Sequence, residues 1–261
     1  MLGNRRLVIT AVSASLGFVS LAFVATTARA QWAMGALPFA RRIFVTPIPG
    51  APFSATEEIS ITSAAANGGA FQRRSFALIA RDSGGRIHNE SRVNVPLTST
   101  RDPWLISFMV YDPNRQMSAF MNPYTHIARE ITFTRAAGAA PPNNWAQHES
   151  PSTLAADPNV RLDDLGTSLM EGLEVHGYRR TATLPQKISG TPQPVIVTDE
   201  YWYSEDLHIN MLEKHTDPRT GELTVRLTKL IRVEPPSNMF DVPLDYKVVD
   251  VTPPSRSLES Q

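Results

Sequence analysis

The sequence predicts a mainly β fold, built as an antiparallel meander with few short helices. Apolar and polar residues alternate along many short segments, which is the pattern of strands with one buried face. Long runs with helical periodicity are missing, and 21 of the 261 residues are proline, which favours turns and edge strands. The chain contains no cysteine, so a hydrophobic core has to stabilise the fold without disulfides.

The first 30 residues have the features of a secretory signal peptide. Arg5 and Arg6 form a basic start, an apolar run up to about Ala25 follows, and Ala28 to Ala30 supplies the small residues that a signal peptidase needs. We therefore expect cleavage after Ala30 and a mature protein that is periplasmic or secreted. The alternative is an uncleaved membrane anchor, because the apolar run approaches the length that spans a bilayer. We expect no membrane span after signal removal.

The N-terminal half, residues 31–135, predicts β hairpins that follow a proline-rich extended stretch. Phe53 to Thr62 alternates toward its end and predicts a strand. A hairpin follows with its turn at Asp82 to Gly85, since glycine supplies the positive φ angles of a tight reversal. A second hairpin turns at Asp112 to Asn114, where proline suits a type I turn. Thr125 to Arg135 alternates again and predicts a further strand.

Residues 136–160 have little periodicity and are rich in alanine, proline, asparagine and serine, which is typical of a loop or linker. Residues 161–250 predict an antiparallel meander that forms one continuous sheet with the N-terminal half. Its turns are expected near Gly172, at Ser204 to Asp206 and at Asp217 to Gly221. Residues 251–261 are expected to form a disordered tail.

The meander predicts a sheet with one apolar face. Apolar residues alternate with polar ones after the turn at Ser204 to Asp206, and again after the turn at Asp217 to Gly221. They are Leu207, Ile209 and Met211 in the first case and Leu223, Val225 and Leu227 in the second. Tyr201 and Trp202 are adjacent, so alternation places them on opposite faces. An apolar sheet face must be covered by the protein itself or by a ligand. The candidate ligand-lining residues are Tyr201, Trp202, Leu207, Ile209, Met211, Leu223, Val225 and Leu227.

Several motifs between residues 165 and 250 resemble a known group of bacterial exported proteins. They include "GLEVHGY" from Gly172, "YWYSEDL" from Tyr201 and "KHTDPRTGE" from Lys214. Their order is similar to that of the lipoprotein-carrier and lipoprotein-sorting (LolA-like) group and of periplasmic sigma-factor regulators, and also to uncharacterised exported proteins. In that group a last element closes the sheet. Its residues correspond to Pro236, Phe240, Pro243 and Tyr246.

The resemblance implies an open, twisted half-barrel of antiparallel strands. The long amphipathic helices that cover the sheet of true lipoprotein carriers have no clear counterpart in this sequence. We therefore carry over the sheet architecture and not the specific cargo.

The sequence shows no catalytic or metal-binding constellation. The adjacent carboxylates Asp163-Asp164 and Glu205-Asp206 lie in turn-like contexts. The six histidines lack ligand spacing, and the nearest two, His208 and His215, would face opposite sides of a strand. Nucleophile-elbow, dinucleotide-binding and phosphate-binding motifs are missing. We predict no catalytic residues, no metal and no cofactor.

Charge and composition narrow the class of partner. Lys plus Arg and Asp plus Glu balance at 25 each, and the basic residues form no stripe, so nucleic acid is not expected. The sequence favours an exported cell-envelope protein that holds an apolar or lipid-like ligand on an open β-sheet without catalysis. The alternative is an envelope scaffold or regulatory protein that binds another protein. An enzyme is the third hypothesis.

Overall fold

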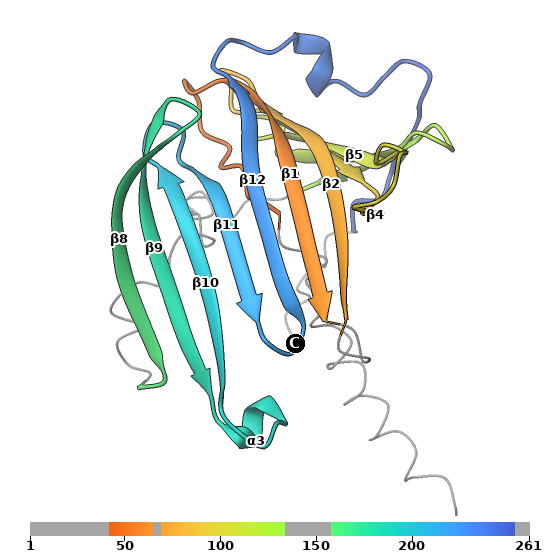
Figure 1. Cartoon of the computed structure of the whole chain (residues 1–261). Coiled ribbons are helices and arrows are strands. Elements are labelled where there is room, and N and C mark those ends of the chain that lie inside the picture. The colour runs from red at the N-terminus through yellow and green to blue at the C-terminus, as the bar shows by residue number, and fades with distance from the viewer. Residues whose placement is uncertain (1–41, 65–68, 134–157, 254–261) are drawn as a thin grey trace, which may run out of the picture. The chain divides into compact units, whose positions relative to one another are not determined.

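The computed structural model shows one large open β-sheet (Figure 1). It describes residues 42–64, 69–133 and 158–253, all within one compact unit. In these ranges the sheet has 13 strands. The strands are β1 (Phe53–Ala64), β2 (Ala70–Arg81), β3 (Ile87–Arg92), β4 (Val95–Pro96), β5 (Leu105–Asp112), β6 (Met117–Asn122), β7 (Ile127–Thr132), β8 (Val160–Met170), β9 (Leu173–Leu184), β10 (Val195–Ser204), β11 (Ile209–Asp217), β12 (Gly221–Ile231) and β13 (Lys247–Asp250).

The sheet runs in the order β13-β7-β6-β5-β3-β2-β1-β12-β11-β10-β9-β8, and β4 pairs with β2 beside this path. Neighbours are antiparallel except β13 and β7, which are parallel. The two end strands, β8 and β13, do not meet in this order, so the sheet stays open. The predicted mainly β, open meander is confirmed. β1 pairs with β12 from Ser54–Ile231 to Ser63–Gly221, which joins the two halves of the chain in the middle of the sheet.

Helical structure is limited to short pieces, as the sequence predicts. In the described ranges these are α3 (Gln186–Ser189), between β9 and β10, and the 3₁₀ turn η1 (Ser237–Phe240). α3 ends at Gly190, whose φ of 69° lies in the left-handed region that glycine adopts without strain. The strands therefore carry nearly all of the regular structure.

Most predicted turns lie where their residues indicate. Asp82 to Gly85 connects β2 with β3, and Gly172 separates β8 from β9. The β5–β6 turn begins at Asp112, whose Oδ1 accepts the backbone N–H groups of Asn114 at 2.9 Å and Arg115 at 3.0 Å. A carboxylate that accepts from the next residues stabilises a reversal in this way.

The turn after β10 is longer than predicted. β10 ends at Ser204 and β11 begins at Ile209, so Leu207 lies in the turn and not in the strand. Leu207 is nevertheless fully buried, and its N–H donates to Ser204 Oγ at 3.4 Å. The prediction that the strand starts at Leu207 was wrong. Leu207 is apolar and lies two positions before Ile209, so it continues the alternation of β11 although it belongs to the turn.

The sheet carries hydrophobic cores on both faces. Residues directly opposite each other in an antiparallel pair lie on the same face, so the registers trace each face across the strands. We call the inner face the one that carries Ile59 of β1, Val225 of β12 and Met109 of β5, and the other the outer face. The larger core lies mainly on the inner face. Its buried members include Ile43, Phe53, Ile79, Ile209, Met211, Leu223, Val225 and Leu227.

A second core lies on the outer face of β2, β5, β6 and β7, with Val110, Met117 and Met121 among its buried side chains. Phe240 of η1 is 3% exposed and covers it. The C-terminal element therefore covers a face of the sheet, and the strand after it, β13, then extends the edge at β7.

Candidate functional site

The structure brings most of the predicted ligand-lining residues together, but as part of the protein's own core. Six of them are 2% exposed or less and belong to the larger core cluster. Trp202 is partly buried against the same cluster, and Tyr201 is half-buried opposite Glu213. This part of the inner face is therefore covered by protein. The six buried residues are Leu207, Ile209, Met211, Leu223, Val225 and Leu227.

An extended segment at the start of the described chain contributes to this cover. We call residues 42–52 the strap. Ile43 and Val45 in the strap are 1% and 4% exposed and join the larger core. Thr46 Oγ1 donates to the carbonyl of His208 at 2.9 Å, which ties the strap to the β10–β11 turn. The strap therefore links the N-terminal end of the described chain to the C-terminal meander.

A fully buried carboxylate holds the start of the strap. Glu57 lies on the inner face of β1, directly opposite Leu227. Its Oε1 accepts the backbone N–H of Ile43 at 2.9 Å, and its Oε2 accepts from Arg42 Nε at 2.7 Å and forms an ion pair with Arg42 Nη2. A buried charge needs such compensation, because removing it from water without a partner costs several kcal/mol.

A fully buried guanidinium holds the other end of the strap. Arg81 donates from Nη1 to the carbonyl of Thr46 at 2.8 Å, and from Nε and Nη2 to Ala51 at 2.9 and 2.7 Å. Nη2 also donates to the carbonyl of Leu207 at 2.8 Å, and the guanidinium lies 5.2 Å from the centroid of the Phe53 ring. Burial lowers the pKa of Arg81 to about 10. The same side chain therefore fastens the strap and the β10–β11 turn.

The inner face continues beyond the strap onto β5, β6 and β7, where apolar side chains remain exposed. Met109 of β5 lies opposite Phe120 of β6, and Ile131 of β7 lies one register step further along this face. Phe120 is 45% exposed. Phe133 follows β7, and its N–H donates to Gln116 O at 2.8 Å, which continues the β6–β7 register and places Phe133 on the face of Ile131; it is 47% exposed. Tyr111, two residues from Met109 on the same face of β5, packs against the larger core, so the open apolar side chains adjoin the buried ones.

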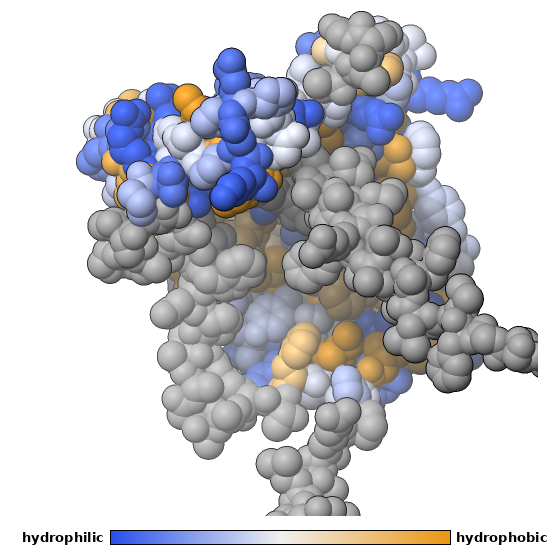
Figure 2. Space-filling view, turned by 90° about the horizontal axis from the view of Figure 1, so that it is seen from below, coloured by the Kyte–Doolittle hydropathy of each residue, from blue (hydrophilic) through white to orange (hydrophobic). Residues whose placement is uncertain are grey.

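We call Met109, Phe120, Ile131 and Phe133 the open patch. Elsewhere on the molecule, Figure 2, seen from below, shows hydrophobic side chains in the recessed middle of the view, beside a raised and more hydrophilic part at its upper left. Large exposed apolar side chains that gather on one face indicate a contact surface. The open patch is such a group on the inner face of β5, β6 and β7.

A polar cluster marks the opposite end of the inner face. Arg180 of β9, Asp199 of β10 and His215 of β11 lie side by side in register. Asp199 is 3% exposed; its Oδ1 lies 2.7 Å from His215 Nδ1, and its Oδ2 accepts from Arg180 Nη1 at 3.4 Å. The cationic and imidazole partners allow this carboxylate to be buried. The inner face is thus polar near β10 and apolar near β5.

Trp202 lies on the outer face, as the alternation predicts. Its ring covers Gly177 on the neighbouring strand, and its Nε1 donates to Glu200 Oε1 at 2.8 Å. Partial burial works to raise the pKa of Glu200, but hydrogen bonds from Trp202 and Arg179 outweigh it and hold that pKa below its usual value. Trp202 therefore packs against the protein and is not part of the inner surface.

The outer face holds a pocket of about 240 Å³ beside the C-terminal segment. Val110, Met117 and Phe240 form its apolar side, and Arg86 and Asp241 lie at its rim. This volume is below the roughly 300–1,000 Å³ of typical small-molecule sites.

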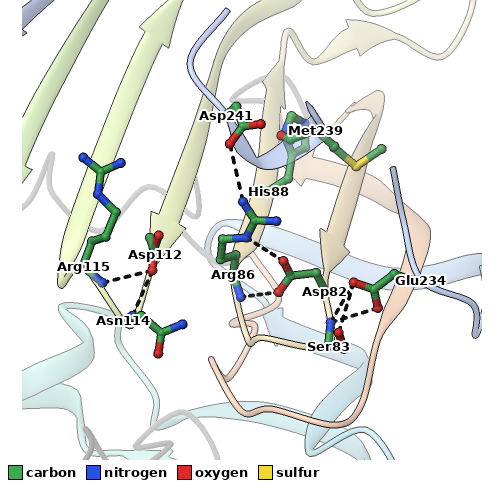
Figure 3. A network of polar contacts seen from close by, with 10 residues as sticks. All are labelled: Asp82, Ser83, Arg86, His88, Asp112, Asn114, Arg115, Glu234, Met239 and Asp241. Atoms are coloured by element: carbon green, nitrogen blue, oxygen red, sulfur yellow. Dashed lines mark hydrogen bonds and ion pairs between the residues drawn. The ribbon is translucent and has the colours of Figure 1, made fainter. Parts of the chain in front are cut away.

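Figure 3 shows how the rim is tied together. Arg86 Nε donates to Asp82 Oδ2 at 2.6 Å, its Nη1 reaches Asp241 Oδ1 at 3.4 Å, and Glu234 accepts from the backbone N–H of Ser83 at 3.0 Å. These contacts join the β2–β3 turn to the C-terminal segment and stabilise the cover of the second core. The open patch is therefore the better candidate for a ligand site.

The described residues offer little for metal chemistry. Among them, no group of three or more His, Cys, Asp or Glu side chains could hold a metal ion. None of the helices in those same ranges is long and apolar enough to cross a membrane. The signal peptide expected over residues 1–30 lies outside the described residues.

No family model matches the sequence, and no curated protein matches it. Solved structures that are similar include a chain of the Pseudomonas aeruginosa MucA/MucB complex, at 14% identity over 76% of this chain, with a TM-score of 0.38. The Mycobacterium tuberculosis lipoprotein LppX is 11% identical, covering 71% of this chain and 88% of its own, with a TM-score of 0.30. A LolA superfamily protein from Nitrosomonas europaea is 11% identical, covering 74% and 91%, with a TM-score of 0.28.

Among these similar structures are MucB and a LolA superfamily protein, which are the kinds of protein that the sequence motifs resemble. At these identities the likeness concerns the fold. The chain spans 58% of the length of the matched chain in the MucA/MucB complex.

The sequence analysis did not identify the open patch. It placed the ligand surface on eight residues of β10, β11, β12 and the β10–β11 turn, six of which are 2% exposed or less. A signal was present in β5, where Phe108 and Val110 alternate with Met109 and Tyr111, so that both faces of the strand are apolar. A strand that is apolar on both faces needs cover on both sides. The outer side has that cover in Phe240, while on the inner side Tyr111 packs against the larger core and Met109 lies beside the exposed Phe120.

Proposed function

We propose that the protein is an exported binding module that holds an apolar, lipid-like ligand on the inner face of its open sheet. The observation that supports this most directly is the open patch, in which Phe120 and Phe133 stay nearly half exposed beside a continuous buried apolar surface. An alkyl chain laid over these side chains would remove them from water at about 25 cal/mol for each Å² of apolar area.

The proposed module acts by binding and not by catalysis. The polar cluster around Asp199 is held by partners on three neighbouring strands, with Arg180 Nη1 and His215 Nδ1 both in contact with the Asp199 carboxylate. The expected export and the cleavage after Ala30 belong to this proposal, and N-terminal sequencing of protein recovered from the envelope or the medium tests them.

The ligand itself is tested with purified mature protein. We expect native mass spectrometry and lipid extraction to recover an apolar ligand, and a neutral hydrophobic dye such as Nile red to bind to the emptied protein. The variant Phe120→Ser should weaken dye binding about fivefold. A bound dye can contact only the exposed part of the Phe120 ring, which is roughly half of its surface, and the variant removes that contact.

A matched control tests whether the effect depends on the face. Ile196 is 56% exposed on the outer face of β10, so Ile196→Ser removes an exposed apolar side chain without touching the inner face. It should leave dye binding unchanged. Equal losses in the two variants, or no ligand and no dye bound to wild-type protein, would overturn the proposal; a single envelope protein captured through the inner face would favour the scaffold alternative.

A further inference from the structure

The open patch has basic side chains along one border. Arg129 of β7 lies directly opposite Phe120 of β6 on the inner face, and Val249 of β13 is its partner on the other side. Lys247 of β13 pairs with Ile127, two residues before Arg129, and therefore lies on the same face. Both side chains are exposed. Arg129 thus lies beside Phe120, and Lys247 lies on the same face one strand further along.

The inner face of the five strands around the open patch carries no acidic side chain. The registers of β3, β5, β6, β7 and β13 place all of their carboxylates on the outer face. On the inner face the same strands carry only neutral residues besides Arg129 and Lys247. The carboxylates on the outer face are Glu90, Asp112, Glu130 and Asp250.

The segregation has a direct electrostatic consequence. Some exposed cations of this protein pair with a carboxylate, as Arg226 does with Glu58 at 3.1 Å on the outer face of β12 and β1. Arg129 and Lys247 have no carboxylate on their own face of these strands, and Asp245, which precedes β13, pairs with His126 Nδ1 at 2.7 Å. The border of the open patch therefore favours a negative charge at the point where the apolar surface ends.

We propose that the ligand of the open patch is a soluble single-chain anionic amphiphile, such as a fatty carboxylate. Its alkyl chain lies over Met109, Phe120 and Ile131, and its headgroup lies between Arg129 and Lys247. This inference rests on the proposed function and specifies the ligand's headgroup. Guanidinium and ammonium groups bind carboxylate oxygens through charge-assisted hydrogen bonds, which adds to the burial of the chain.

The test compares three amphiphiles with the same ten-carbon chain and different heads. Decanoate, decanol and decyltrimethylammonium, each below its micelle concentration, compete with Nile red for wild-type protein. Decanoate should bind about tenfold more tightly than decyltrimethylammonium at low salt, and this ratio should shrink as ionic strength rises. A ratio of one, or a preference for the cationic head, would overturn the inference.

Variants separate the headgroup inference from the proposed function. The double variant Arg129→Gln/Lys247→Gln should bring the decanoate preference to within about twofold while decanol binding is unchanged. Arg115→Gln, which removes an exposed charge at the β5–β6 turn, should keep the preference. If the double variant keeps the preference, the headgroup assignment fails. If wild-type protein binds none of the three, the proposed function fails with it.

One further arm distinguishes a soluble amphiphile from a membrane surface. Vesicles of phosphatidylglycerol carry the same type of charge, but their acyl chains are held in a bilayer. We expect no sedimentation of the protein with these vesicles under conditions where decanoate binds. Sedimentation that depends on Arg129 and Lys247, without binding of monomeric decanoate, would overturn the inference in favour of an anionic membrane surface.

Discussion

Gly177 shows how one residue fits two strands together. It lies on β9 directly opposite Trp202 of β10, and an added Cβ would lie 2.8 Å from two ring atoms of that tryptophan. Real Cβ atoms do not approach this closely, and a tryptophan ring held by a hydrogen bond to Glu200 cannot bend away. The "GLEVHGY" and "YWYSEDL" motifs therefore contain a packing pair, with glycine under the ring of the aromatic residue.

We predict that Gly177→Ala lowers the free energy of unfolding by about 1–3 kcal/mol through overpacking. In a Trp202→Leu background the same change should cost less than about 0.5 kcal/mol, because the ring that clashes is gone. Gly84→Ala is the control, since its added Cβ would meet Asp82 Oδ1 at an ordinary 3.4 Å. Urea unfolding measures wild type and the four variants, and equal costs in both backgrounds would contradict the packing argument.

His88 is a buried histidine with one unpartnered ring nitrogen. Its Nδ1 lies 2.9 Å from the carbonyl of Met239, so Nδ1 carries the hydrogen and donates, and its Nε2 is buried without a partner. Burial lowers the pKa of His88, and the bond to Met239 and the charge of Glu90 only partly oppose this. A proton on Nε2 would place an unpaired N–H beside the second core.

This arrangement predicts acid sensitivity with a definite sign. Below pH 6.5 the unfolded chain protonates His88 while the folded protein does not, so stability falls as pH falls until the lowered pKa is reached. The loss amounts to at most about 1.4 kcal/mol for each pH unit in that window. His88→Phe should show a shallower decline than wild type between pH 6.5 and 5 in urea unfolding. Parallel pH profiles for the two proteins would contradict it.

The strap illustrates how an element without regular structure becomes part of the core. It has few backbone partners, and two buried side chains of opposite charge replace them, Glu57 near its start and Arg81 at its other end. Its prolines limit the number of conformations that the strap has in the unfolded chain, so less conformational entropy is lost when the strap packs. Because the strap contributes Ile43 and Val45 to the core, loss of its fastening would expose the inner face under it.

We predict that Glu57→Gln destabilises the protein by about 3–5 kcal/mol, since it removes one partner of a buried ion pair. The neighbouring variant Glu58→Gln is the matched control. Glu58 points to the outer face and pairs with Arg226 there, with both side chains well exposed, so its loss should cost less than about 1 kcal/mol. Chemical denaturation gives both values, and hydrogen exchange should show faster exchange at Ile43 only in Glu57→Gln.

At the scale of the whole molecule, much of the fold could be predicted from alternation and turns. Strand identity, the hairpin at Asp82 to Gly85 and the low helix content follow from local residues. The pairing of β1 with β12 does not, because its partners lie more than 150 positions apart, as in Ile59 and Val225. Nor does the parallel addition of β13 to β7 follow from any local pattern.

The candidate site was less predictable for a related reason. Alternation identifies which residues of β11 and β12 share a face, but not whether that face is covered. The cover includes the strap, whose prolines predict only an extended stretch. The strap is held in place by Arg81, which also binds the carbonyl of Leu207, a residue far from it in the sequence. The open patch could be located only once the registers of β5, β6 and β7 were known.

The central position of the β1–β12 pair predicts that the two halves of the chain fold as one unit. β1 belongs to the N-terminal half and β12 to the C-terminal half, and the larger core takes Phe53 and Ile79 from the first and Met211 and Val225 from the second. A fragment of residues 42–133 would leave an apolar face and a strand edge without cover, and so would a fragment of residues 158–253.

We expect neither fragment alone to show a cooperative thermal transition in calorimetry, and we expect an equimolar mixture to recover one. The intact mature protein should unfold in a single transition, with a calorimetric enthalpy equal to the van't Hoff enthalpy. Leu227→Ala, which removes a buried side chain beside Glu57 at the β1–β12 pair, should lower that one transition without splitting it. Two separate transitions in the intact protein, or a fragment that unfolds cooperatively by itself, would show that the halves are independent domains.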